Sequence, residues 1–227
     1  MDRAAVPAGP ALVAQCRFTE ASDGDFRIDA EQPGLDDRRR AVVDAPWTWL
    51  TQVHGATVVV VDRPGDGAGT EADASVTASI GAPLAIQTAD CVPVLLVGEG
   101  IVGAAHAGWR GLAQGVLDAT VEVMRRRSDG PIEALVGPHI SASAYEFGAD
   151  DLDGLVRRFG PSVAATSSTG TPALDVAEAV RVSLDRLDVA GMRFVGGCTG
   201  SSTRWHSPRV RGDRARQTSV IWLEERS

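Results

Sequence analysis

Three separate segments of the chain carry side chains that can bind a transition metal. His54 lies in the segment QVHG, Cys91 ends the segment TADC, and His106 lies in the segment AHAGWRG. One thiolate and two imidazoles suit zinc, and three protein ligands leave a fourth position for water or substrate, as a catalytic zinc requires. The sequence therefore predicts a catalytic zinc site formed by these three side chains.

Cys91 lies between two apolar runs and directly follows an acidic residue. Most free cysteines are buried structural thiols. Asp90 directly precedes this one, however, and a buried carboxylate without a partner is costly. We therefore interpret Cys91 as a thiolate ligand and take Asp90, Cys91 and His106 as the candidate catalytic residues. Asp90 would act as a general acid or base or would orient a ligand, with a purely structural ion pair as the alternative.

The surroundings of His106 also favour a functional site. Small residues flank it on both sides, and they leave room for a ligand or for a close approach of the backbone. Arg110 follows at the expected start of a helix, where N–H groups and the helix dipole already favour an anion. We interpret Arg110 as a candidate anion contact, with an ordinary ion pair as the alternative.

The other histidines carry less information. A single histidine before a glycine is usually solvated, so His54 counts only as the third member of the metal set. His139 follows a Gly-Pro dipeptide that can simply end a strand, and we set His206 aside as a metal ligand because it has no supporting context.

Composition narrows the partners and the compartment. The chain has 22 basic and 30 acidic residues, a formal charge of −8, which argues against nucleic-acid or anionic-membrane binding. Its three cysteines include no C-x-x-C pair and fit a reducing compartment. No apolar stretch is long enough for a membrane span, and the N-terminal segment is too weakly apolar for a secretory signal. We therefore expect a cytoplasmic protein.

Apolar patterning predicts an α/β fold with a mixed sheet and flanking helices, because strands cluster before and after helices instead of alternating strictly with them. Residues 1–40 have weak patterning, and we expect them to be irregular. Strands are expected at 57–62, 83–88, 92–97, 101–105, 132–136, 192–195 and 218–223. Helices are expected at 112–127, 150–159 and 174–187.

These segments together closely resemble the YfiH family of laccase-domain proteins, described earlier as polyphenol oxidases and later as purine nucleoside phosphorylases. The matching segments are TQVHG (51–55), EADASVT (71–77), TADCVPVLL (88–96), AAHAGWRG (104–111), GPHIS with YEF (137–147) and a Ser-x-Arg element near the C-terminus. The resemblance implies one mixed α/β domain over residues 1–227, with residues 1–46 as a divergent N-terminal portion. It also implies zinc bound by His54, Cys91 and His106.

The resemblance further implies a small-molecule reaction. Family members cleave adenosine, inosine and methylthioadenosine with phosphate, and they can deaminate adenosine. The expected partners are therefore a purine nucleoside and phosphate, with no nucleic acid and no membrane. Phosphorolysis passes through an oxocarbenium-like state, so such a site must hold phosphate near the sugar and stabilise the departing purine. Gln52, Arg110 and Arg209 are the candidate substrate-binding residues.

The chain departs from the family where phosphate contacts are expected. The family signature Phe-Thr-x-Arg near the N-terminus has Ala21 in place of its arginine. The C-terminal element Ser-x-Arg-Arg is SPRV (207–210) here, with Arg211 one step late, and Ala144 replaces a cysteine before the Tyr-Glu pair. Losing one charge-assisted contact weakens phosphate binding about ten- to a hundredfold. Weak phosphorolysis, a different nucleoside or a shifted activity would each follow.

Three other functions are compatible with the same residues. Cys91 could be the nucleophile of a metal-free thiol hydrolase or amidase, with His54 or His106 as the base; related proteins are linked to peptidoglycan fidelity. The metal could instead be structural, in a non-catalytic paralogue. Copper-dependent phenol oxidation is less favoured than zinc chemistry because the axial methionine of a blue-copper site is not evident.

Overall fold

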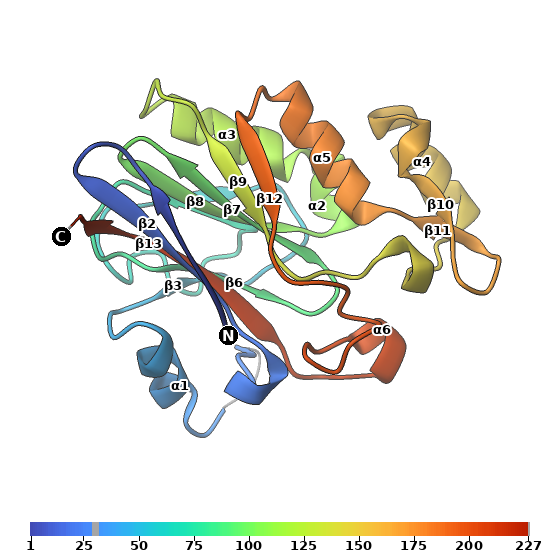
Figure 1. Ribbon diagram of the computed structural model, residues 1–227, viewed down its shortest axis with the longest axis horizontal. Coiled ribbons are helices and arrows are strands. Elements are labelled where there is room, and N and C mark those ends of the chain that lie inside the picture. The colour runs from blue at the N-terminus through green and yellow to red at the C-terminus, as the bar shows by residue number, and fades with distance from the viewer. Residues whose placement is uncertain (29–31, 227) are drawn as a thin grey trace.

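Apolar runs rich in β-branched residues form two β-sheets stacked face to face in this computed structural model, which describes residues 1–28 and 32–226 (Figure 1). The five-stranded sheet contains, in spatial order, β1 (Asp2–Pro7), β2 (Leu12–Phe18), β13 (Gln217–Glu225), β6 (Leu84–Thr88) and β3 (Thr48–Trp49). The six-stranded sheet contains β12 (Gly191–Phe194), β9 (Glu133–Val136), β7 (Val92–Gly98), β8 (Ile101–Ala107), β5 (Ala74–Thr77) and β4 (Val58–Val61). A separate pair joins β10 (Ala164–Thr166) to β11 (Pro172–Leu174).

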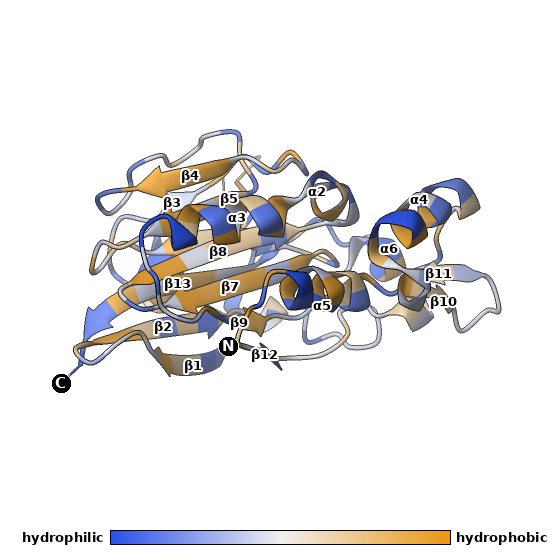
Figure 2. Ribbon diagram, turned by 90° about the horizontal axis from the view of Figure 1, so that it is seen from above, coloured by the Kyte–Doolittle hydropathy of each residue, from blue (hydrophilic) through white to orange (hydrophobic). Residues whose placement is uncertain are grey.

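Helices cover the outer faces of the two sheets. The helices are α1 (Leu35–Val42), α2 (Trp109–Gln114), α3 (Val116–Arg125), α4 (Ala149–Phe159), α5 (Val176–Arg186) and α6 (Pro208–Arg211), with short 3-10 turns η1 (Ala21–Asp23), η2 (Ala142–Ala144) and η3 (Pro161–Val163). In Figure 1, α2, α3 and α5 lie on the outer side of the six-stranded sheet, whereas α1 lies beyond the five-stranded sheet. Figure 2, viewed from the helix side, shows the apolar strands β7 and β8 beneath α3 and α5.

The core consists of three apolar layers that follow from this stacking. One layer lies between the six-stranded sheet and the helices and contains Val94, Val121 and Leu184. A second layer joins the two sheets, and a third packs Trp222 of β13 toward α1. Burying one large apolar side chain contributes about 1.5–3 kcal/mol, so these layers supply most of the driving force for the fold.

Alternation along β8 directs His106 toward the other sheet. Side chains two residues apart in a strand share a face, and Val102 and Ala104 both belong to the layer between the two sheets. His106 is next in this series and is only 3 % exposed. The position of the imidazole is therefore set by the strand itself.

The mixed α/β architecture predicted from the sequence is confirmed. The pairs β3–β6, β4–β5 and β9–β12 are parallel, and the other strand pairs are antiparallel. All of the expected strands are present, with ends shifted by one or two residues, as are the second and third expected helices, α4 and α5. The short strands β3, β5, β10 and β11 were not predicted. Within the described residues, no helix combines the length and apolar character needed to cross a membrane.

The expectation that residues 1–40 are irregular is wrong for most of that segment. β1 and β2 form an antiparallel hairpin, and β2 then pairs with β13, with Phe18 opposite Ser219. Helix α1 begins before residue 40. Residues 29–31 lie outside the described residues. The local pattern was weak because β2 gains its buried face from a partner at the other end of the chain.

The single helix expected at 112–127 is also wrong, since the segment is divided into α2 and α3. Gly115 ends the first helix and begins the second with a φ of 87°. Only glycine adopts this left-handed conformation without strain. The break turns α3 so that it packs across β8, where Gly103 leaves room for the Met124 sulfur.

Glu20 links the N-terminal hairpin to the C-terminal segment. Its carboxylate accepts a charged contact of 2.9 Å from Nε of Arg204, and its side chain is 16 % exposed. Hydrogen bonding from Arg204 is the main reason that the pKa of Glu20 is lowered to about 2. A carboxylate whose pKa is lower in the folded chain than in the unfolded chain stabilises the fold above its unfolded pKa.

We therefore predict that Glu20→Gln destabilises the protein near neutral pH by about 1 kcal/mol, or a few degrees in Tm. The difference from wild type should shrink as the pH falls from about 4.5 to about 2, where the folded carboxylate becomes protonated. Thermal unfolding at a series of pH values measures it. Glu122→Gln, which removes an exposed helix ion pair with Arg126, is the matched control. If the loss of stability in Glu20→Gln does not change with pH, the Glu20 carboxylate does not stabilise the fold through its lowered pKa.

Candidate functional site

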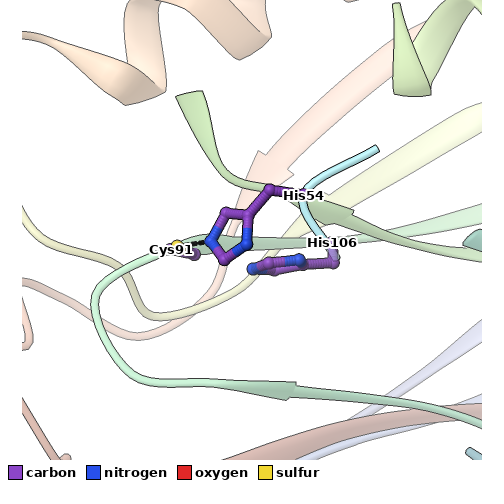
Figure 3. Close-up of side chains that lie close together, drawn as sticks. All are labelled: His54, Cys91 and His106. Atoms are coloured by element: carbon purple, nitrogen blue, oxygen red, sulfur yellow. Dashed lines mark hydrogen bonds between the residues drawn. The ribbon is translucent and has the colours of Figure 1, made fainter. Parts of the chain in front are cut away.

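The three predicted metal ligands come together at one end of the space between the sheets. His54 lies in the loop after β3, Cys91 in the turn between β6 and β7, and His106 near the end of β8. Their ligand atoms all lie within 4.8 Å of one another, with 3.9 Å between the Cys91 sulfur and Nε2 of His54. Figure 3 shows the two imidazoles beside the Cys91 side chain. The ring centroids of His54 and His106 are 4.7 Å apart, and the ring planes lie at 73° to each other. This is the one such cluster found among the described residues.

Asp73, which directly precedes β5, holds the cluster together. Its carboxylate accepts hydrogen bonds from the backbone N–H groups of Val53 (3.1 Å), His54 (2.9 Å) and Gly55 (2.7 Å). The same carboxylate lies 2.8 Å from Nδ1 of His106. Asp73 is fully buried, so these bonds compensate for the loss of water around its charge. One side chain therefore fixes the positions of two of the three candidate ligands.

The Asp73 contact also determines which nitrogen of His106 is available. Nδ1 donates to the carboxylate, so Nε2 is the nitrogen that faces the cluster. Metal-bound histidines characteristically donate their other N–H group to a carboxylate or carbonyl in this way. Burial raises the pKa of Asp73, but the His106 bond and the backbone N–H groups outweigh it and hold this pKa below its usual value.

Gly108, which precedes α2, leaves space for the ligands. A Cβ atom there would lie 2.7 Å from Cδ2 of His54 and 3.3 Å from the Cys91 sulfur. The backbone φ of −71° is ordinary, so space and not conformation requires glycine at this position. The small residues of the segment AHAGWRG thus admit the other two ligands beside His106.

The charges of the cluster favour a thiolate. Burial raises the pKa of Cys91, but the nearby His106 and His54 more than compensate and lower it. Burial lowers the pKa of His106, whereas the Cys91 sulfur and Asp73 raise it overall. Without a metal, the two side chains therefore favour a thiolate beside an imidazolium. A cation with two positive charges can replace the proton between them.

Asp90 is bonded away from the cluster. Its carboxylate accepts hydrogen bonds from the hydroxyl of Thr199 (2.5 Å) and from the backbone N–H of Arg209 (2.9 Å). Its φ of 80° is unusual for a residue other than glycine. Of the two roles considered for Asp90, this geometry favours orientation of the Cys91 turn over proton transfer.

The three predicted substrate-binding residues have different surroundings. Gln52 donates from Nε2 to the Gln87 carbonyl (2.8 Å) and accepts from the Gln87 N–H (2.9 Å), which extends the pairing of β3 with β6. Arg110 is exposed and stacks on Trp109 at 4.2 Å. Arg209 is exposed and lies over the Tyr145 ring at 5.1 Å. Gln52 therefore shapes the site, while the two arginines are open to solvent beside aromatic rings.

A pocket of about 440 Å³ adjoins the cluster and is lined by all three candidate ligands. Trp49 and Gln87 line it as well, as do Arg27 and Arg216 from opposite ends of the chain. The volume lies in the range typical of small-molecule sites. The pocket can therefore bring a ligand with an aromatic ring and an anionic group next to the candidate metal ligands.

Sequence reasoning did not identify Asp73, Trp49 or the two pocket arginines as site residues. Asp73 had a detectable signal, because it is an acid directly between Ala72 and Ala74 in an apolar segment. The same cost of burial that drew attention to Asp90 applies to it. Trp49, Arg27 and Arg216 had no comparable local signal, because only the folded chain brings them to one pocket.

Comparison with known proteins identifies the family. Residues 22–224 match the family model described as multi-copper polyphenol oxidoreductase laccase. A Streptomyces coelicolor protein named purine nucleoside phosphorylase is 40% identical over 181 residues, which are 78% of this chain and 74% of the relative. A Pseudomonas aeruginosa protein of the same name is 35% identical and covers 98% of this chain and 94% of its own length.

Solved structures share the fold over nearly the whole chain. A Neisseria meningitidis protein of family DUF152 superposes with a TM-score of 0.82 at 28% identity, covering 99% of this chain and 100% of its own. YlmD from Geobacillus stearothermophilus has a TM-score of 0.79 at 26% identity, covering 98% and 94%. The expected resemblance to YfiH-type laccase-domain proteins is thus confirmed, and the chain belongs to the family described as multi-copper polyphenol oxidoreductase laccase.

Proposed function

We propose that this protein is a zinc-dependent purine nucleoside phosphorylase that acts on adenosine, inosine or methylthioadenosine in the cytoplasm and can also deaminate adenosine. The observation that carries the proposal is the convergence of His54, Cys91 and His106 beside a 440 Å³ pocket. The names of the relatives from Streptomyces and Pseudomonas support the substrate class.

The donor set supports zinc over copper. One thiolate and two imidazoles bind zinc well and leave a position for substrate. A blue-copper site adds a weak axial methionine to the same set. Met124, however, is fully buried on α3, in the layer between the helices and the six-stranded sheet. Met124 is therefore not placed to serve as the axial ligand of a copper site.

The protein contributes binding and orientation. Zinc, when bound, would supply a Lewis acid next to the pocket. Asp73 keeps His106 in the tautomer that presents Nε2, and it fixes the His54 loop. Trp49 offers an aromatic face on which a purine can stack. Asp90 holds the Cys91 turn against the backbone of Arg209, so the exposed Arg209 side chain stays near the cluster.

A second function is favoured by one specific observation. The pKa of Cys91 is lowered and that of His106 is raised, which is the arrangement of a thiolate nucleophile with a histidine partner. A metal-free thiol hydrolase or amidase would use the same two side chains. Metal content distinguishes the two functions, because zinc occupies the sulfur that a nucleophile must keep free.

We predict that the protein binds close to one equivalent of zinc and that His54→Ala and Cys91→Ser each remove most of it. Loss of one of three ligands leaves too few donors to hold the ion. Elemental analysis of protein purified without added metal measures this. Cys198→Ser, which removes a thiol outside the cluster, should leave the zinc content unchanged. Metal-free wild type whose Cys91 is readily alkylated would support the thiol hydrolase instead.

Asp73→Asn should weaken zinc binding by about ten- to a hundredfold, because outer partners of metal-bound histidines tune affinity by this amount. The asparagine retains the shape but loses the negative charge opposite Nδ1 of His106. Competition with a chelator measures the affinity. Asp62→Asn, at an exposed carboxylate at the end of β4, is the control. Equal zinc affinity in wild type and Asp73→Asn would show that the carboxylate does not act through the metal ligand.

Zinc-loaded protein should convert adenosine and inosine to the free base only when phosphate is present, and should release some ammonia from adenosine. Cys91→Ser should abolish both reactions, because the thiolate is a metal ligand. Chromatography of the products and an ammonia assay measure the two activities separately. Absence of any product from adenosine, inosine and methylthioadenosine would contradict the proposed function.

A further inference from the structure

The pocket beside the metal cluster has a basic lining in an acidic protein. The chain carries a formal charge of −8. Yet, apart from the candidate metal ligands His54, Cys91 and His106, the charged side chains among the described residues that line this pocket are Arg27 and Arg216, and no aspartate or glutamate is among these lining residues. A low-dielectric cavity with one sign of charge attracts the opposite ion. The lining therefore favours a ligand with an anionic group.

Asp25 brings the two arginines together from opposite ends of the chain. One oxygen of its carboxylate accepts hydrogen bonds from the backbone N–H of Arg27 (2.9 Å) and of Arg216 (3.0 Å). The N–H of Phe26 donates to the Arg216 carbonyl at 2.9 Å. The segment before α1 is thus fixed against the start of β13, and both arginines lie at the same pocket.

Both guanidinium groups are held in place and can still bind a ligand. Nε of Arg27 donates to Asp25 at 2.8 Å, and its side chain is 20 % exposed. Nη1 of Arg216 donates to the carbonyls of Arg214 (2.9 Å) and Ala215 (3.0 Å). A guanidinium has five N–H donors, so each group keeps further donors for an anion. Two positive charges against one carboxylate leave the pair with a net positive charge.

Two residues that line the pocket also carry buried polar atoms without a hydrogen-bond partner in the described part of the chain. Oε1 of Gln87 and Oγ1 of Thr88 have no hydrogen-bond partner among the described residues. The two residues are 8 % and 2 % exposed and both line the pocket. Buried polar atoms are rarely left unpaired without a reason. The pocket therefore combines an anion-binding pair, an aromatic ring and polar atoms next to the metal ligands.

We infer that Arg27 and Arg216 form a phosphoryl-binding subsite in the pocket that adjoins His54, Cys91 and His106. Paired guanidinium groups match the oxygens of a phosphoryl group through parallel N–H···O bonds. The inference rests on the proposed function and identifies where the phosphate of that reaction is held. Arg27 comes from the same N-terminal segment in which Ala21 stands where the resemblance calls for arginine.

The phosphoryl group has two possible sources. Inorganic phosphate would be the second substrate of phosphorolysis, whereas a 5′-phosphate would belong to a nucleotide ligand. Isothermal titration of zinc-loaded protein with inorganic phosphate, and separately with adenosine 5′-monophosphate and adenosine, distinguishes these sources. Binding is measured without turnover, so the result does not depend on which reaction the enzyme catalyses.

Arg27→Gln and Arg216→Gln should each weaken phosphate binding by about ten- to a hundredfold, the effect of losing one charge-assisted contact. Arg214→Gln, an exposed arginine two positions from Arg216, is matched in charge and should bind phosphate as wild type does. Arg216→Lys should recover part of the affinity, because it restores the charge without the paired donors. Thermal unfolding of each variant verifies that the fold is intact.

Steady-state kinetics separates this inference from the proposed function. In both glutamine variants the KM for phosphate should rise by more than the KM for the nucleoside, whereas Arg214→Gln should change neither. If the two variants lose affinity for adenosine monophosphate but bind inorganic phosphate as wild type does, the subsite is supported. The phosphoryl group that it binds is then that of a phosphate ester. Unchanged affinity for both phosphates would overturn it even if phosphorolysis occurs. Arginine-dependent phosphate binding without phosphorolysis would uphold the subsite and reject the proposed function.

Discussion

The buried carboxylate of Asp73 is the interaction on which the site depends. It joins the loop of residues 53–55 to His106 of β8 through three backbone N–H groups and one imidazole. A buried carboxylate is stable only when its charge is matched by donors. The donors in turn gain a fixed position, so the candidate metal ligands and Asp73 stabilise each other. Without this carboxylate, the His54 loop would lose the bonds that hold it above β8.

Two candidate ligand segments are held in left-handed backbone conformations that residues other than glycine rarely adopt. The φ of His54 is 59° and that of Asp90, directly before Cys91, is 80°. Such conformations cost about 1–3 kcal/mol each and persist only where surrounding bonds enforce them. Asp73 enforces the first conformation, and Thr199 with the Arg209 backbone enforces the second. Part of the folding free energy is thus used to hold these two segments in the geometry of the cluster.

The sequence was sufficient to predict those parts of the fold and of the site that depend on a local pattern of residues. The apolar runs around Cys91 predicted β6 and β7, and the small residues beside His106 indicated a site. It was insufficient where a residue acts through a distant partner. β2 looks irregular until it pairs with β13, and Asp73 looks ordinary until it meets the N–H of His54. Gly115 was misread for a different reason: an isolated glycine in a helical pattern is usually tolerated, and only its φ of 87° shows that the helix ends there.

The N-terminal segment and the cluster of His54, Cys91 and His106 are built from separate parts of the chain. The cluster is built from the loop after β3, the β6–β7 turn, β5 and β8, none of which lies within residues 1–46. That portion reaches the site through Arg27 and Ile28 in the pocket wall. Substitution of either residue would change the charge or the shape of the pocket wall. Such substitutions leave the Asp73 bonds untouched, since no donor to Asp73 comes from the described part of that segment. The pocket wall can therefore change without changing the contacts that hold the cluster.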